Sequence, residues 1–112
     1  MTRRKVLTAL ALIAGALTMA PALAQQGASL TITVKNHRFQ PAQLTAPANL
    51  PITLTVKNLD PTPMEFESVG LRVEKVVTGG GQGVIRLRPL SPGSYNFFDD
   101  FHQETTGTLV VR

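Results

Sequence analysis

The densest group of chemically active side chains lies near the C-terminus. Residues 99–104 read Asp-Asp-Phe-His-Gln-Glu, so three carboxylates and one imidazole fall within six residues. Carboxylate oxygens and imidazole nitrogens together form a common ligand set for iron, copper or zinc. The alternative is an acidic loop that is simply solvated. We treat Asp99, Asp100 and His102 as candidate metal ligands.

A second acidic pair occurs in the segment Met64-Glu65-Phe66-Glu67. If this segment is a strand, Glu65 and Glu67 share one face and lie about 7 Å apart. They join the candidate ligands, although an exposed strand face would also account for them. Met64 points the other way and is expected in the core, so it is a weaker candidate. His37 is also weaker, because it stands alone in a predicted loop.

Most catalytic arrangements are absent from this sequence. It contains no cysteine, which excludes thiol nucleophiles and disulfides. None of the four serines lies in a nucleophile elbow, and no glycine-rich phosphate loop opens a helix. The three glycines at 79–81 are predicted to form a hairpin link. We therefore do not expect an enzyme.

The first 24 residues have the pattern of a secretory signal. Residues 2–5 are Thr-Arg-Arg-Lys, residues 6–19 are uncharged and apolar, and residues 21–24 read Pro-Ala-Leu-Ala. The apolar stretch is 14 residues long, too short to span a membrane comfortably, although an uncleaved anchor is the alternative. The two arginines also loosely fit the twin-arginine pattern, but the general secretory route is favoured. We predict a signal peptide over 1–24 and a periplasmic domain over 25–112.

The predicted export changes the meaning of the net charge. The whole chain carries +4, but removal of Arg3, Arg4 and Lys5 leaves eight basic residues against seven acidic ones. A nucleic-acid-binding domain needs a basic face, which such a balance does not support. We therefore expect no nucleic-acid partner.

The remaining sequence is typical of an all-β domain. Leu30, Ile32 and Val34 alternate with polar residues, and so do residues 52–57, which is the period of a half-buried strand. Seven or eight short strands with frequent turns predict a Greek-key β-sandwich. The expected strands cover residues 29–35, 43–46, 52–57, 64–68, 71–77, 84–88, 93–98 and 107–112. The expected loops at 36–41, 58–63 and 99–106 carry most of the candidate ligands.

Residues 90–98, Leu-Ser-Pro-Gly-Ser-Tyr-Asn-Phe-Phe, resemble the penultimate strand of the cupredoxins. In plastocyanin-like members this strand ends in a cysteine ligand, and a histidine ligand follows three positions later. Asp99 and His102 stand at these two places. Met64 falls about where the first histidine ligand of that family stands. The resemblance implies that the three loops meet at one end, with His37, Met64, Glu65, Asp99 and His102 as near neighbours.

A narrower resemblance is to the EfeO-type cupredoxin-like domains of periplasmic iron-uptake systems. Glu65-Phe66-Glu67-Ser68 and Phe97-Phe98-Asp99-Asp100-Phe101-His102 look like the signatures of their cysteine-free members. This resemblance implies an accessory of ferrous-iron uptake that binds iron or copper. Its expected partner is an iron permease or a larger periplasmic iron-uptake protein.

Without cysteine, a blue-copper site is excluded, and the carboxylate and histidine set suits iron better. Three alternatives are left open. One is a metal-free module whose acidic loop docks onto a permease or a larger partner. Another is a Cu(I) chaperone that uses Met64, His37 and His102. The third is a role in assisting the oxidation of Fe(II).

Overall fold

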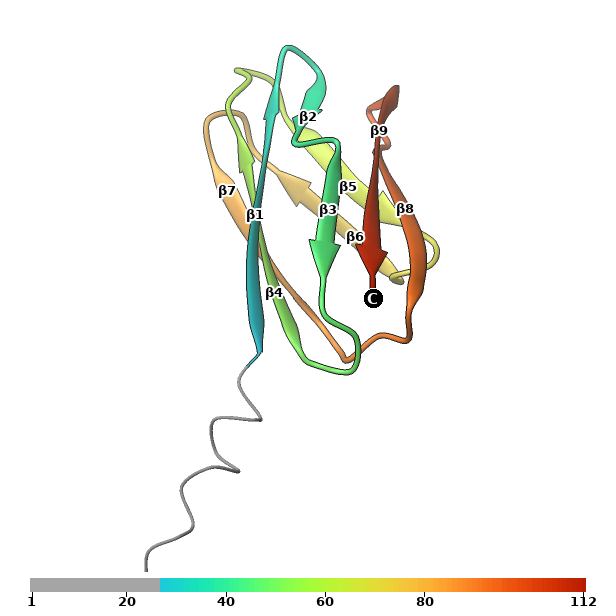
Figure 1. The fold of residues 1–112 in the computed structure, drawn as a ribbon. Helices are drawn as coiled ribbons and strands as arrows, with labels where there is room; N and C mark the ends of the chain where they lie inside the picture. The colour runs from blue at the N-terminus through green and yellow to red at the C-terminus, as the bar shows by residue number, and fades with distance from the viewer. Residues whose placement is uncertain (1–26) are drawn as a thin grey trace, which may run out of the picture.

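The computed structural model describes residues 27–112 as a two-layered β-sandwich (Figure 1). This confirms the all-β prediction, whereas the predicted signal peptide lies outside the described residues. Within 27–112 there is no helix, and therefore none that could cross a membrane. The nine strands are β1 (Ala28–Lys35), β2 (Arg38–Gln40), β3 (Gln43–Ala46), β4 (Ile52–Asn58), β5 (Met64–Ser68), β6 (Val73–Val77), β7 (Gln82–Leu87), β8 (Gly93–Asp99) and β9 (His102–Val111).

The strands form one sheet of four and one of five. Their orders are β2-β1-β4-β7 and β3-β9-β8-β5-β6. β1 pairs in parallel with β4, and β3 pairs in parallel with β9, while the other pairs are antiparallel. Parallel neighbours need a crossover between them. Between β1 and β4 the chain crosses to the other sheet and contributes β3, which ties the two layers together.

The core follows the period-two alternation of the sequence. In β4 the inward residues Ile52, Leu54 and Val56 are at most 2% exposed, while Thr53 and Thr55 face outward. Burying such side chains stabilises the fold by about 1.5–3 kcal/mol each.

Three phenylalanines join the two sheets in this core. Phe39 belongs to the four-stranded sheet, while Phe66 and Phe97 belong to the five-stranded sheet. The ring of Phe97 lies 4.9 Å, centroid to centroid, from each of the other two. Aromatic pairs at such distances contribute beyond their buried area. The sheets are therefore firmly packed together without a disulfide.

Two elements differ from the sequence prediction. The predicted loop at 36–41 contains a ninth strand, β2, whose three residues are too few to show a period. β9 begins at His102 rather than at residue 107, so the predicted loop at 99–106 is reduced to a tight turn at Asp100 and Phe101.

The start of β9 could not be predicted from the sequence, because the pairing of β8 with β9 is irregular there. Phe98 pairs with Thr106, but Asp99 pairs with His102, so residues 103–105 bulge from β9. A bulge breaks the alternation of side chains and re-aims those next to it.

Candidate metal centre

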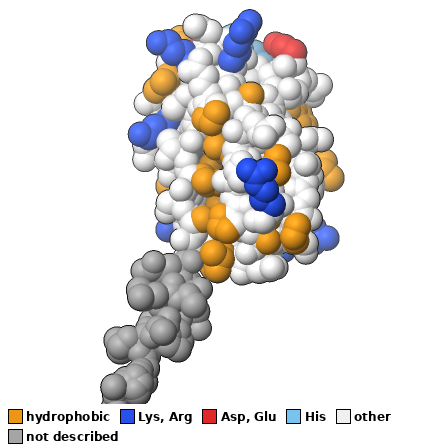
Figure 2. Space-filling model, in the orientation of Figure 1, with side chains coloured by type: hydrophobic (Ala, Val, Ile, Leu, Met, Phe, Trp, Pro, Cys, Tyr) orange, Lys and Arg blue, Asp and Glu red, His pale blue; other side chains and the backbone are white. Residues whose placement is uncertain are grey.

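Three connections meet at one end of the sandwich, at the top of Figure 1. They are the β1–β2 turn, the link between β4 and β5, and the β8–β9 turn. Hydrogen bonds join the first two connections through Asp60, and Thr105 donates from its hydroxyl to the carbonyl oxygen of His37 at 2.6 Å. In Figure 2 the visible acidic and histidine atoms lie together at this end, whereas Lys and Arg are spread widely.

The β1–β2 turn is built around the carboxylate of Asp60. Asn36 and His37 both have left-handed backbones, with φ of 53° and 56°. Their two amides donate to Asp60 Oδ1 at 2.7 Å and Oδ2 at 3.0 Å. The bond from the His37 amide, and to a smaller extent that from Asn36, holds the pKa of Asp60 below its usual value. Desolvation by burial opposes this effect. Sequence reasoning missed Asp60, because its only signal was a place in a proline-rich link.

Asn58 and the triple glycine hold the Asp60 link in place. The fully buried Asn58 accepts the Asp60 amide at 3.1 Å and donates to the Thr62 carbonyl at 2.8 Å. A Cβ on Gly79 would collide with the Pro61 carbonyl oxygen, and the Gly80 amide donates to the Asp60 carbonyl at 3.0 Å. The glycine run is therefore packed against this link.

Asp99 lies in the interior and acts as an acceptor for three neighbours. Its side chain is 0% exposed. Oδ1 accepts the amides of Glu65 at 2.9 Å and Phe101 at 3.0 Å. Oδ2 lies 2.9 Å from His102 Nδ1. With both oxygens already engaged, Asp99 orients its neighbours, and in this arrangement it is poorly placed to coordinate a metal itself.

His37 and His102 form what we call the imidazole pair. Their ring centroids are 4.0 Å apart, with an interplanar angle of 32°. His37 Nδ1 lies 3.6 Å from Asp60 Oδ2, so each ring turns Nδ1 toward a carboxylate. Within residues 27–112 no hydrogen bond reaches Nε2 of either ring. Metal-binding histidines commonly have the arrangement of His102, in which a carboxylate holds the other ring nitrogen.

Glu65, Glu67 and Asp100 form a second group, which we call the carboxylate triad. One oxygen from each residue lies within 4.8 Å of the others. Glu65 and Glu67 face outward from β5, and the β8–β9 turn brings Asp100 beside them through a 2.9 Å bond from its amide to the Glu65 carbonyl. The triad therefore lies on the outer face of the five-stranded sheet.

The triad is electrostatically unfavourable without a cation. Desolvation most of all, followed by nearby carboxylates, raises the pKa of both Glu65 and Glu67. Glu74 of β6 stands directly opposite Glu67. Within residues 27–112 no Lys or Arg forms an ion pair with these groups. Like charges opposite one another across two strands are destabilising.

The candidates expected in one site therefore divide into groups. His37, Asp99 and His102 lie together at the end of the sandwich. Glu65, Glu67 and Asp100 gather on the outer face. Met64 is 1% exposed and packs in the core, on the opposite face of β5 from the triad. Metal binding by any of these residues stays a prediction.

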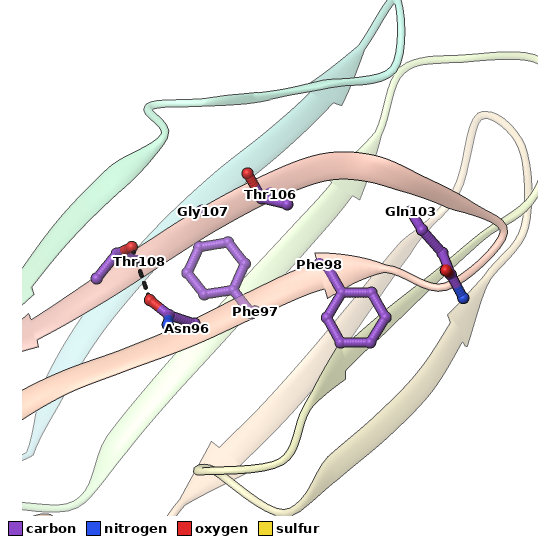
Figure 3. Close-up of a pocket in the computed structure, with 7 residues that line it drawn as sticks. All are labelled: Asn96, Phe97, Phe98, Gln103, Thr106, Gly107 and Thr108. Atoms are coloured by element: carbon purple, nitrogen blue, oxygen red, sulfur yellow. Dashed lines mark hydrogen bonds between the residues drawn. The ribbon is translucent and has the colours of Figure 1, made fainter.

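A shallow groove of about 540 Å³ lies next to the triad. Figure 3 shows that its lining residues come from β8 and β9. They include Phe98 and several amide and hydroxyl side chains, and Thr108 donates to Asn96 Oδ1 at 3.1 Å. Gln103 connects the groove to the triad, because its Nε2 donates to Asp100 Oδ1 at 2.8 Å. No lining residue carries a charge, so the candidate metal ligands lie beside the groove and do not line it.

Comparison with known families identifies this architecture. The family model for the cupredoxin-like domain matches residues 7–111. This chain belongs to the cupredoxin-like domain family. It is also similar to an uncharacterised protein of Rickettsia prowazekii (strain Madrid E), with 41% identity over 80 residues. That match covers 71% of this cupredoxin-like chain and 64% of the relative's length.

Solved cupredoxin structures share the fold at low sequence identity. A purple cupredoxin from Nitrosopumilus maritimus has 20% identity to this chain and a TM-score of 0.58. The match covers 73% of this chain and 98% of the purple cupredoxin chain. A second structure is the metal-binding domain of the Cu(I)-exporting P-type ATPase CopA of Streptococcus pneumoniae D39, solved with Cu(I). It has 20% identity to this chain and a TM-score of 0.66, and the match covers 77% of this chain and 87% of that domain. Auracyanin from Roseiflexus castenholzii has 16% identity to this chain and a TM-score of 0.64, and the match covers 75% of this chain and 96% of the auracyanin chain.

The residues of this chain do not fit the blue-copper centre of that fold. Such a centre needs a cysteine thiolate with two histidines, and the sequence has no cysteine. Asp99, which the resemblance places at the cysteine position, is engaged by internal donors, and Met64 is buried. His102, which the resemblance places at a histidine-ligand position, keeps its Nε2 without a hydrogen-bond partner among residues 27–112.

Proposed function

We propose that this cupredoxin-like domain is a periplasmic metal-binding accessory of iron uptake, which binds iron at the carboxylate triad. The observation that carries the proposal is the convergence of Glu65, Glu67 and Asp100 to within 4.8 Å. Three hard oxygen ligands suit iron better than they suit Cu(I). Desolvation, followed by repulsion from nearby carboxylates, raises the pKa of Glu65 and Glu67, and a bound cation would offset both effects.

Copper is the second candidate metal, and the imidazole pair supports it. Imidazole nitrogen is a good ligand for copper, and the Asp99 carboxylate that holds Nδ1 of His102 leaves Nε2 as the ligand atom of that ring. The metal-binding domain of CopA, which has this fold, was solved with Cu(I). The Cu(I) chaperone alternative needs Met64 as a ligand beside His37 and His102. Met64 is buried in the core, which counts against this alternative.

Calorimetric titration of the purified protein with Fe(II), Fe(III) and Cu(II) tests both assignments. We expect the triple variant Glu65→Gln, Glu67→Gln, Asp100→Asn to lose iron binding and keep copper binding. The variant His37→Ala, His102→Ala should behave in the opposite way. Glu104→Gln, which removes an exposed carboxylate outside the triad, is the control. If the triple variant still releases or absorbs the heat of iron binding seen with the wild-type protein, the proposal is wrong.

The partner would be an iron permease or a larger periplasmic iron-uptake protein. Phe101 and Leu59 are exposed by 49% and 54%, and both belong to connections at the end that carries the imidazole pair. Exposed apolar side chains next to charged ones are common at docking surfaces. If the domain is instead a metal-free docking module, the triple variant should still bind the partner as well as the wild-type protein does. Under the iron-carrier proposal, partner binding should require iron and an intact triad.

A further inference from the structure

We propose that Asp99 is a positioning residue that determines which ring nitrogen of His102 is free to bind a ligand. This inference rests on the proposed binding of a metal at the imidazole pair, but its main test needs no metal. It also assigns Asp99 a role different from that of a direct ligand.

The first step is the chemistry of the Asp99–His102 contact. Asp99 Oδ2 and His102 Nδ1 are 2.9 Å apart, which is a full hydrogen bond. An ionised carboxylate can only accept, so Nδ1 must carry the proton. In the neutral ring the lone pair is then on Nε2, and Nε2 is the atom that can bind a metal.

The second step is a contrast with the other ring of the pair. His37 Nδ1 lies 3.6 Å from Asp60 Oδ2, which is too long for a hydrogen bond. The Asp60 carboxylate instead accepts two backbone amides. No hydrogen bond in residues 27–112 therefore fixes the tautomer of His37. The pair thus contains one ring with a fixed tautomer and one without, which serves as an internal reference.

The third step concerns the other oxygen of the same carboxylate. Asp99 Oδ1 accepts the amides of Glu65 and Phe101. Glu65 belongs to the triad, and Phe101 directly follows Asp100 in the β8–β9 turn. One buried carboxylate therefore holds His102 on one side and the backbone of the triad on the other.

The geometry makes Asp99→Asn a selective test. Two amide donors face Oδ1, so the oxygen of the asparagine must stay there and its NH₂ group must face His102. The ring can then accept only at Nδ1, and its proton moves to Nε2. The contacts to Glu65 and Phe101 are kept, so the triad should be undisturbed.

The tautomers can be read from long-range ¹H–¹⁵N correlation spectra at a pH where both rings are neutral. We expect wild-type His102 to be protonated at Nδ1 and the Asp99→Asn variant to be protonated at Nε2, with His37 unchanged. Cu(II) affinity should fall by about 10- to 100-fold, as for other carboxylates that hold a histidine ligand. Iron affinity should stay within about twofold, because Oδ1 keeps its role.

Two results would overturn the inference. One is wild-type His102 protonated at Nε2, and the other is an Asp99→Asn variant with unchanged tautomer and Cu(II) affinity. The wild-type spectrum gives an answer even if the variant does not fold. Failure of the proposed copper site is a separate result, in which wild-type protein shows the expected tautomer but binds no Cu(II).

Discussion

Glu67 illustrates, at the level of a single residue, a conflict between stability and the proposed binding of iron. Its pKa is raised in the folded protein, so the ionised form is destabilising, and this penalty grows as the pH rises through that pKa. Glu67→Gln removes the penalty. We expect a higher Tm at pH 7, by a few degrees, and no difference below pH 4. Thermal unfolding at both pH values, with Glu104→Gln as the control, measures this.

Asp60 is predicted to behave in the opposite way. Its pKa is lowered in the folded protein, so it stabilises the fold above pH 3.8, and the effect is lost as the pH falls through the lowered value. Asp60→Asn should reduce the free energy of unfolding by about 1–3 kcal/mol at pH 7, because two amides lose a charged acceptor. Urea unfolding from pH 7 to pH 2 should show the two proteins converging in acid. A constant difference across that range would contradict this explanation.

The link between β6 and β7 makes a prediction at the level of an element. A Cβ on Gly79 meets the backbone of Pro61, whereas one on Gly80 meets nothing within 4 Å. Gly80 has a φ of 73°, so Gly80→Ala costs about 1 kcal/mol through backbone strain alone. Gly79→Ala should cost more and also displace the Asp60 link. Urea unfolding compares the two, and the His37 resonances should shift in Gly79→Ala only.

Elements were predictable where alternation was regular and were missed where it was not. The alternating residues of β1 and β4 place their apolar side chains inward, as expected. The hairpin with β2 was missed within the predicted loop at 36–41, because Asn36 and His37 adopt left-handed backbones without the glycine that usually indicates a hairpin turn. The beginning of β9 was missed because residues 103–105 form a bulge.

At the scale of the molecule, the sequence indicated the fold and which loops meet. It did not indicate that the candidate ligands divide between the carboxylate triad and the imidazole pair. The outward direction of Glu65 and Glu67 follows from strand periodicity and is found. The inward direction of Asp99 depends on its pairing with β5 and β9, which are far apart in the chain. The division into a triad and an imidazole pair is therefore a property of the tertiary structure.

Metal removal should reveal this division in the stability of the whole domain. A ligand that binds only the folded state stabilises it by about 2.7 kcal/mol at a free concentration of 100 times its Kd. We expect iron to raise the Tm of the wild-type protein and a chelator to reverse the rise. The triple triad variant should show neither change, while the His37→Ala, His102→Ala variant should show both.

The outer-face position of the triad has a consequence for the rate at which an ion is exchanged. The three carboxylates are only partly buried and lie on a sheet surface, next to an open groove. If iron binds there as proposed, water could replace each protein oxygen in turn, without a loop having to open. Such a site would favour rapid transfer over long retention, which is the behaviour that the proposed role of an iron carrier requires.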